Sequence, residues 1–154
     1  MPSAFIVQET TTKTKYKFFI SKHSADSFEV NNNHTAVRLT LFHQNVQSLR
    51  NKKTSMELLL TEKTSNFDII CITEHWLKDY EFEYLNLNTY SLISKFCRKD
   101  KANGGSCIYV KSNIEARECT LFQHLNQEEH FEASIVELTQ YNIMIICVYR
   151  TPTS

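Results

Sequence analysis

The sequence predicts an α/β fold with a mixed, strand-rich sheet and few helices. Two unbroken apolar runs, at residues 69–72 and 143–148, are typical of strands that are buried on both faces. Between residues 37 and 73 the pattern is strand, helix, strand, which has the size of a βαβ unit. A chain of 154 residues suits one domain and is long enough to bury a core.

Charge and cysteine content narrow the class of protein. Lys+Arg and Asp+Glu are 17 each, so no net charge points to a polyanionic or polycationic partner, although a local patch remains compatible with this balance. The five cysteines form no C-x-x-C pair, and we expect reduced thiols in an intracellular protein, nuclear or cytoplasmic. No signal peptide is evident in residues 1–22, and no apolar run is long enough to span a bilayer.

Residues 1–35 are expected to form a poorly ordered leader, with a short strand or helix near Phe18 and a loop at 31–34. The predicted domain covers residues 36–154. Its first strand is Val37–His43, where apolar and polar residues alternate. A helix follows, and the capping box Thr54-x-x-Glu57 predicts where it begins. Its apolar face carries Met56, Leu59, Leu60 and Lys63, and it should end near residue 65.

The next strand is predicted at residues 68–73. It runs directly into Glu74, His75 and Trp76, which are candidate site residues. Residues 76–88 then suggest a loop with a short helix. Strands at 90–95 and 106–110 indicate a hairpin, whose tip would carry Gly104 and Gly105, the two glycines of the chain. Further strands are expected at 131–138 and 142–149.

Three predicted strands end in residues that can do chemistry, namely Asn45, Glu74 and Tyr149. If these strands are neighbours in one sheet, the three residues lie along one edge, where open α/β sheets keep their sites. An amide, a carboxylate and a phenol suit a hard divalent cation, because magnesium is held by one or two carboxylates while substrate phosphates and waters complete its shell. Such an ion, Mg²⁺ or Mn²⁺, would polarise a phosphoryl oxygen.

Four sequence blocks carry a resemblance to a known family. The chain resembles the endonuclease/exonuclease/phosphatase superfamily, and most of all the apurinic-like endonuclease domain of non-long-terminal-repeat retrotransposons. The resemblance covers about residues 37–154, and the order and spacing of the blocks agree. The blocks are residues 43–52 (HQNVQSLRNK), 68–77 (DIICITEHWL), 104–110 (GGSCIYV) and 149–152 (YRTP).

The resemblance implies a fold, a substrate and roles for residues. The fold would be approximately the first half of a four-layer α/β-β/α sandwich, and the activity would be magnesium-dependent nicking of DNA. Glu74 would ligate the catalytic magnesium, Asn45 would hydrogen-bond in the site, and Tyr149 would contact the scissile phosphate.

The chain also departs from this family. Gln47 stands where an acidic or other polar residue often supports the metal, and Thr151-Pro152 replaces a Pro-Pro-like pair. The sequence contains no Asp-x-Asn motif, which in the family positions the attacking water, and it lacks the closing Ser-Asp-His, which supplies a histidine paired with an aspartate. We therefore expect a truncated domain with little or no activity alone. Two alternatives are a non-catalytic remnant or binding module that associates through an exposed sheet edge, and another phosphoesterase of the superfamily.

Weaker candidates lie elsewhere in the chain. Arg98, Lys99 and Arg150 are candidate phosphate contacts, since phosphates dominate nonspecific nucleic-acid affinity; a solvated basic loop explains the stretch around 95–101 equally well. His75 and Trp76 resemble a ligand and a stacking platform, but a core role is the simpler interpretation. Acids outnumber bases between residues 115 and 137, so this face is not expected to touch DNA.

Overall fold

The computed structural model describes residues 3–9, 14–20, 23–32, 35–62 and 66–151. Within them, ten strands form two five-stranded sheets, which we name sheet A (order β2-β1-β10-β9-β8) and sheet B (order β3-β4-β5-β7-β6). The strands of sheet A are β1 (Ser3–Glu9), β2 (Thr14–Ile20), β8 (Ala116–Glu118), β9 (Glu132–Leu138) and β10 (Ile143–Tyr149). Those of sheet B are β3 (His23–Asn32), β4 (Thr35–Asn45), β5 (Ile69–Thr73), β6 (Tyr90–Phe96) and β7 (Ser106–Lys111).

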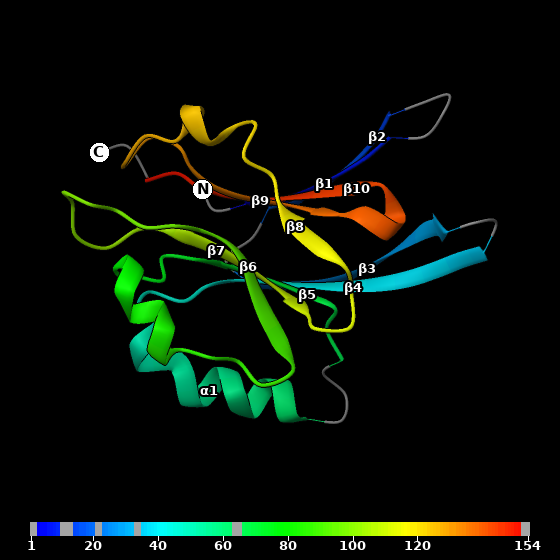
Figure 1. Cartoon of the computed structure of the whole chain (residues 1–154). Helices are drawn as coiled ribbons and strands as arrows, with labels where there is room; N and C mark the ends of the chain where they lie inside the picture. The colour runs from blue at the N-terminus through cyan, green and yellow to red at the C-terminus, as the bar shows by residue number, and fades with distance from the viewer. Residues whose placement is uncertain (1–2, 10–13, 21–22, 33–34, 63–65, 152–154) are drawn as a thin grey trace.

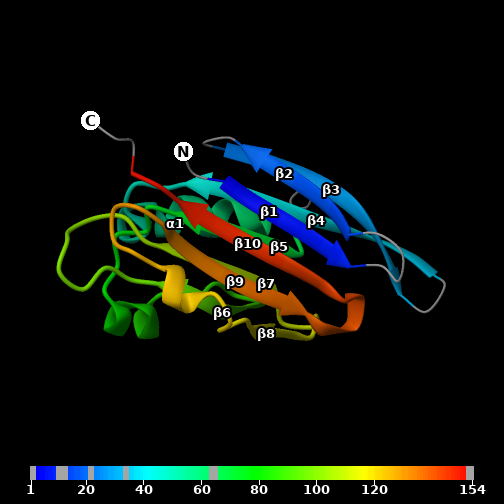
Figure 2. The same ribbon diagram turned by 90° about the horizontal axis from the view of Figure 1, so that it is seen from above.

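The described residues contain one α-helix, α1 (Leu49–Thr61), and three short 3₁₀ helices, which are η1 (Asp79–Tyr84), η2 (Gln123–Leu125) and η3 (Thr139–Tyr141). Figure 1 shows α1 against the outer face of sheet B, with sheet A stacked on its other face. Seen from above, the strands of the two sheets lie roughly along the same axis (Figure 2). The predicted fold class, α/β with a mixed, strand-rich architecture and few helices, is confirmed.

Strand β5 is buried on both faces, as its apolar run predicts. Ile69 and Cys71 belong to the core between the sheets, whereas Ile70 and Ile72 belong to the core between sheet B and α1. Each isoleucine has no exposed surface, and burying such a side chain contributes about 2 kcal/mol to folding. One five-residue strand therefore anchors both cores, and the chain that leaves it is firmly placed.

The pairing of β5 determines where two candidate residues emerge. Strands β4 and β5 are parallel, with Asn45 opposite Thr73, so Asn45 and Glu74 leave the sheet at the same end. Strand β10 lies in sheet A, however, so the three strands are not neighbours in one sheet. Tyr149 still reaches this end, because β10 packs across β5 and β7, with the Cys147 thiol donating to the Ile72 carbonyl at 3.6 Å.

The N-terminal region differs from the expected leader. Strands β1, β2 and β3 occupy much of residues 3–32, and β1 pairs antiparallel with β10 while β3 pairs antiparallel with β4. Phe28 and Val30 of β3 are buried in the core between the sheets. Their alternation along one strand is the only local signal of this element, since its other residues are polar or small.

The helix begins earlier than its predicted capping box. Ser48 is the N-cap of α1 and accepts a hydrogen bond from the Asn51 backbone N–H at 3.4 Å. Thr54 and Glu57 lie inside the helix, so the capping-box prediction is wrong. Met56 is buried and Leu59 and Leu60 are half-buried against sheet B, which confirms the predicted apolar face up to Leu60; Lys63 and Ser65 lie outside the described residues.

The predicted hairpin is present as the antiparallel pair β6 and β7, but its glycines are not at its tip. Gly104 and Gly105 lie directly before β7, with φ angles of +63° and +88°. A Cβ on Gly104 would lie 2.2 Å from Arg98 Nε, and one on Gly105 would lie 2.3 Å from His75 Nε2. These glycines therefore permit close approach of two side chains rather than a tight turn.

The outer face of sheet A carries apolar side chains that are only partly buried. Met144, Ile146 and Val148 of β10 alternate with its fully buried residues and pack with Phe131 and Ile135. Among the described residues no α-helix covers this face, since α1 lies on sheet B (Figure 1). None of the described helices is long and apolar enough to cross a membrane.

The position of the helix cap can be tested by two alanine variants. We expect Ser48→Ala to lower the free energy of unfolding by about 1 kcal/mol, because the cap hydrogen bond is lost. Thr54→Ala should change it by no more than a few tenths of a kcal/mol, because Thr54 is an exposed residue inside the helix and alanine is a good helix former. Urea unfolding measures both, and the reverse order of effects would show that Thr54 is the cap.

Candidate functional site

The candidate site forms where three segments meet at one end of sheet B. Backbone hydrogen bonds join the segment after β4 to the end of β5 and the residues that follow it, from Val46 N to Thr73 O, Ser48 N to Glu74 O and Leu49 N to His75 O, each at 3.0 Å. The glycine pair closes the other side, because Gly105 O accepts from Glu74 N at 2.8 Å and Gly104 O from Trp76 N at 3.0 Å. The backbone of Glu74 is thus held on both sides.

Several residues of these segments have left-handed backbone conformations. The φ angles are +46° and +89° at Gln47 and Ser48, and +55° and +60° at Glu74 and Trp76. Such angles are uncommon for residues other than glycine and cost free energy, about 1–3 kcal/mol each when they are strained. Strained conformations cluster at functional sites, so their concentration around Glu74 supports a functional role for this end of the sheet.

The three residues predicted from the strand ends come together here. Asn45 Nδ2 donates to Glu74 Oε1 at 2.8 Å, and both side chains are half-buried. Tyr149 is buried; burial, followed by its hydrogen bond with Glu74 and that carboxylate's charge, raises the pKa of Tyr149 to about 12. The Tyr149 phenol is therefore protonated at neutral pH and acts as a hydrogen-bond donor rather than a base.

The donor set contains one carboxylate that could ligate a magnesium ion. No group of three His, Cys, Asp or Glu side chains that could hold a metal occurs in the described part of the chain. Magnesium, however, is often bound by one carboxylate together with phosphate oxygens and waters, and Glu74 can supply that carboxylate. Asn45 Oδ1 is enclosed without a hydrogen-bond partner among the described residues, and such an acceptor is commonly satisfied by a bound water or ion.

His75 is a structural residue rather than a ligand. Its Nδ1 accepts from the Leu77 backbone N–H at 2.9 Å, and its Nε2–H donates to the Phe96 carbonyl at 2.8 Å. Burial, which is the largest influence, lowers the pKa of His75 to about 4. Because both ring nitrogens are used by the backbone, the interpretation of His75 as a core residue is the better one. Trp76 is half-buried, and its Nε1 is enclosed without a hydrogen-bond partner in the described region.

The three candidate phosphate contacts lie in different surroundings. Lys99 and Arg150 are exposed, as a phosphate contact requires. Arg98 is buried, and its Nε donates to Glu132 Oε1 at 2.5 Å. The guanidinium is therefore not the exposed phosphate contact that the sequence predicted. A groove of about 670 Å³ beside it is lined by residues 78–80 and 95–99.

Glu132 was not among the predicted site residues. Its carboxylate has no exposed surface and accepts from Arg98, from the Gly105 backbone N–H at 2.6 Å and from the Glu129 backbone N–H at 2.8 Å. The sequence contains one clue, because Glu132 directly precedes the apolar β9 run, just as Glu74 directly follows the run of β5. A carboxylate in such a position is either at a surface or paired inside.

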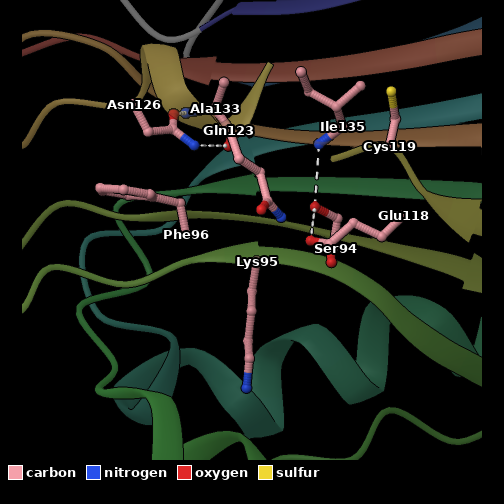
Figure 3. A pocket seen from close by; sticks show the side chains of 9 residues that line it. All are labelled: Ser94, Lys95, Phe96, Glu118, Cys119, Gln123, Asn126, Ala133 and Ile135. Carbon is pink, nitrogen blue, oxygen red and sulfur yellow. Dashed lines mark hydrogen bonds between the residues drawn. The ribbon is translucent and has the colours of Figure 1, made fainter. Parts of the chain in front are cut away.

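A separate cavity of about 260 Å³ lies between the edge of sheet B and strands β8 and β9. Figure 3 shows Gln123 reaching into it, while Lys95 points away towards α1. Its polar groups are largely paired with each other: Ser94 Oγ donates to Glu118 at 2.9 Å and accepts from Ile135 N at 3.1 Å, and Asn126 bonds both backbone groups of Ala133 (Figure 3). None of the predicted site residues lines this cavity.

Comparisons of the chain with protein-family models, with curated proteins and with solved structures gave no match.

The low pKa of His75 predicts a pH-dependent stability. In the unfolded chain this imidazole takes up a proton near pH 6.5, whereas in the folded protein it does so only near pH 4. Between these values the unfolded state binds more protons, so the free energy of unfolding falls as the pH falls from 6.5 to 4, by up to about 3 kcal/mol. Chemical denaturation at a series of pH values measures this loss.

His75→Asn is the matched variant, because the Asn Oδ1 can replace Nδ1 as acceptor for the Leu77 N–H without titrating. We expect its free energy of unfolding to depend less steeply on pH than that of the wild type in this range. His130→Asn, at an exposed position, is the control and should keep the wild-type slope. An unchanged slope in His75→Asn would assign the pH dependence to other groups.

Proposed function

We propose that this chain carries part of a magnesium-dependent phosphodiesterase site, that of a DNA endonuclease of the kind found in non-long-terminal-repeat retrotransposons. The proposal combines the resemblance of four sequence blocks with the arrangement of the residues in them. A nuclear or cytoplasmic location belongs to the same proposal, since DNA is the substrate and all five cysteines have free thiols.

The observation that carries the proposal is the meeting of Asn45, Glu74 and Tyr149. They come from the ends of three strands in two sheets, yet Asn45 donates to Glu74 at 2.8 Å, and the Glu74 carboxylate lies close enough to Tyr149 to contribute to the raised pKa of its phenol. A carboxylate with an amide on one side and a protonated phenol on the other is an arrangement that can hold a hard cation and a phosphate side by side.

Each residue has a distinct role in this proposal. Glu74 would ligate magnesium, which when bound supplies charge that polarises the phosphoryl group and stabilises the leaving oxygen. Asn45 fixes the orientation of the Glu74 carboxylate through its Nδ2 donor. Tyr149 would donate its phenol proton in a hydrogen bond to a phosphate oxygen, because its raised pKa keeps it protonated.

The sequence lacks the motifs that complete such a site in the family that it resembles. The sequence has four aspartates, Asp26, Asp68, Asp79 and Asp100, and none of them belongs to an Asp-x-Asn motif or precedes a histidine. Asp68 is used structurally, since its carboxylate accepts from Thr40 N at 2.8 Å. The chain therefore carries the metal-binding and phosphate-positioning part of the site.

A second candidate function is that of a non-catalytic binding module. The half-buried side chains Met144, Ile146 and Val148 on sheet A favour it, because an apolar sheet face of this kind is suited to association. In that case Glu74 would have no affinity for a metal, so metal binding separates the two candidates. Another phosphoesterase of the same superfamily would share the metal site and differ in substrate.

Metal binding can be tested directly with Mn²⁺, whose free form is detected by electron paramagnetic resonance. We expect weak binding by the wild type that becomes tighter when a short DNA duplex is present, since phosphate oxygens complete the metal shell. Glu74→Gln should weaken the affinity roughly tenfold or more, because it removes the charged ligand.

Glu83→Gln is the matched control, because Glu83 is an exposed carboxylate on η1. It should bind Mn²⁺ as the wild type does. If Glu74→Gln and Glu83→Gln bind equally well, Glu74 is not the metal ligand and the binding-module function becomes the better one.

Nicking of supercoiled plasmid in the presence of Mg²⁺ tests the extent of the site. We expect no nicking above background by the purified chain, because the water-positioning Asp-x-Asn motif and the Asp-His pair are both absent from its sequence. Conversion to open-circular DNA is read on an agarose gel. Nicking by the wild type that Glu74→Ala abolishes would support the metal role but contradict the inference that the site is incomplete.

A further inference from the structure

The three side chains of the candidate site come from two different sheets. Asn45 and Glu74 are placed by sheet B, whereas Tyr149 is the last residue of β10 in sheet A. A phenol at a strand end meets a carboxylate of the other sheet only if the two sheets are fixed relative to each other at this end. Arg98 and Glu132 form a buried ion pair that joins the two sheets at this end.

Arg98 uses three of its nitrogens in three directions. Its Nε donates to Glu132 Oε1 at 2.5 Å, its Nη1 to Ala102 O at 2.8 Å and its Nη2 to Thr151 Oγ1 at 3.1 Å. Its Cζ lies 5.9 Å from the centre of the Tyr149 ring. The guanidinium thus binds the residue two positions after Tyr149 and contacts the ring of Tyr149 itself.

Glu132 connects the strand that carries Tyr149 to the backbone of Glu74. It is the register partner of Tyr149 in the β9–β10 pair. Its Oε2 accepts from Gly105 N at 2.6 Å, and the Gly105 carbonyl accepts from Glu74 N at 2.8 Å. A continuous path of hydrogen bonds therefore runs from the backbone of Glu74 through Gly105 to the strand neighbour of Tyr149.

Both members of the pair are nearly inaccessible to solvent, with side-chain exposures of 6% for Arg98 and 0% for Glu132. Taking two charges out of water is costly, and apolar residues would often stabilise a fold equally well. A buried pair with this many directed contacts is therefore better explained by the geometry that it imposes than by the stability that it adds.

We infer that Arg98 and Glu132 are positioning residues of the site, which hold the Tyr149 phenol against the Glu74 carboxylate across the two sheets. This inference rests on the proposed function of Tyr149 and Glu74, and it adds two residues that do not themselves touch the substrate. Arg98, expected from the sequence to contact phosphate, acts through Tyr149 instead.

The test measures the coupling between Glu74 and Tyr149, with tyrosine labelled by ¹³C at Cζ and its phenol titrated by NMR. Tyr149→Phe identifies the resonance among the seven tyrosines. In the wild-type background, Glu74→Gln should lower the measured pKa of Tyr149 by about one unit, because a neighbouring carboxylate is removed.

Arg98→Lys is the main variant, because lysine keeps the charge opposite Glu132 but lacks the planar fork that satisfies three directions. In this background we expect Glu74→Gln to shift the pKa of Tyr149 by less than about half of the wild-type shift. Full coupling in Arg98→Lys would overturn the inference, because a positive charge at this position would then be enough to hold Tyr149 against Glu74.

Two further variants make the result decisive. Arg117→Lys alters an exposed arginine that pairs with Glu137 on neighbouring strands of sheet A, and it should leave the coupling unchanged. Glu132→Gln keeps the size of the side chain, but its single amide oxygen cannot replace both carboxylate oxygens that accept from Arg98 and from the Gly105 N–H, so it replaces Arg98→Lys if that variant does not fold. Full coupling in Glu132→Gln would then overturn the inference.

The readout uses neither magnesium nor DNA. A negative result would therefore refute the positioning role alone, whereas the Mn²⁺ experiment with Glu74→Gln refutes the proposed function alone. If Tyr149 shows no coupling to Glu74 even in the wild type, there is no contact to position and the inference also fails.

Discussion

The structure depends on a carboxylate that has no contact with solvent. Glu132 accepts hydrogen bonds from Arg98, Gly105 and Glu129, and in this way it joins the β6–β7 loop of sheet B to the start of β9 in sheet A. Removing one partner of such a group leaves an uncompensated buried charge, which costs about 3–5 kcal/mol. At the end of the sandwich that carries the candidate site, buried polar contacts therefore join the sheets in addition to the apolar core between them.

The two glycines are required by the same arrangement. Arg98 and His75 occupy the space that a side chain on Gly104 or Gly105 would need, and each glycine carbonyl accepts a hydrogen bond from the segment after β5. The left-handed conformations of Glu74 and Trp76 are fixed by these bonds. Both glycines of the chain thus lie where a side chain, that of Arg98 or His75, packs directly against the backbone.

Much of the fold could be predicted from local patterns. The apolar runs of β5 and β10 and the strand–helix–strand order indicated buried strands, and the parallel β4–β5 pair placed Asn45 beside Glu74 as expected. An apolar run looks the same in either sheet, however, so the placement of Tyr149 in sheet A had no local signal. Ser48 and Thr54 are both good cap residues, and only packing of the helix decides between them.

The burial of Arg98 could not be predicted for a related reason. Its partner Glu132 is 34 positions away along the chain, in a segment that the sequence predicted to be an acidic strand with no role in the site. Arg98 itself stands among exposed basic residues such as Lys99, which share its composition but not its surroundings. Long-range ion pairs leave no periodic pattern, so residue type alone favoured a surface role.

The pairing of β1 with β10 has a consequence for how the chain reaches this structure. Ser3 lies opposite Val148 and Gln8 opposite Ile143, so one of the central contacts of sheet A joins residues that are almost the full length of the described chain apart. Closing so long a loop is entropically costly, and proteins rich in such contacts fold slowly. During synthesis the β1–β2 hairpin must wait until β10 has been made. Sheet A is therefore completed late, after the local β6–β7 hairpin and the β4–α1–β5 unit of sheet B can already have formed.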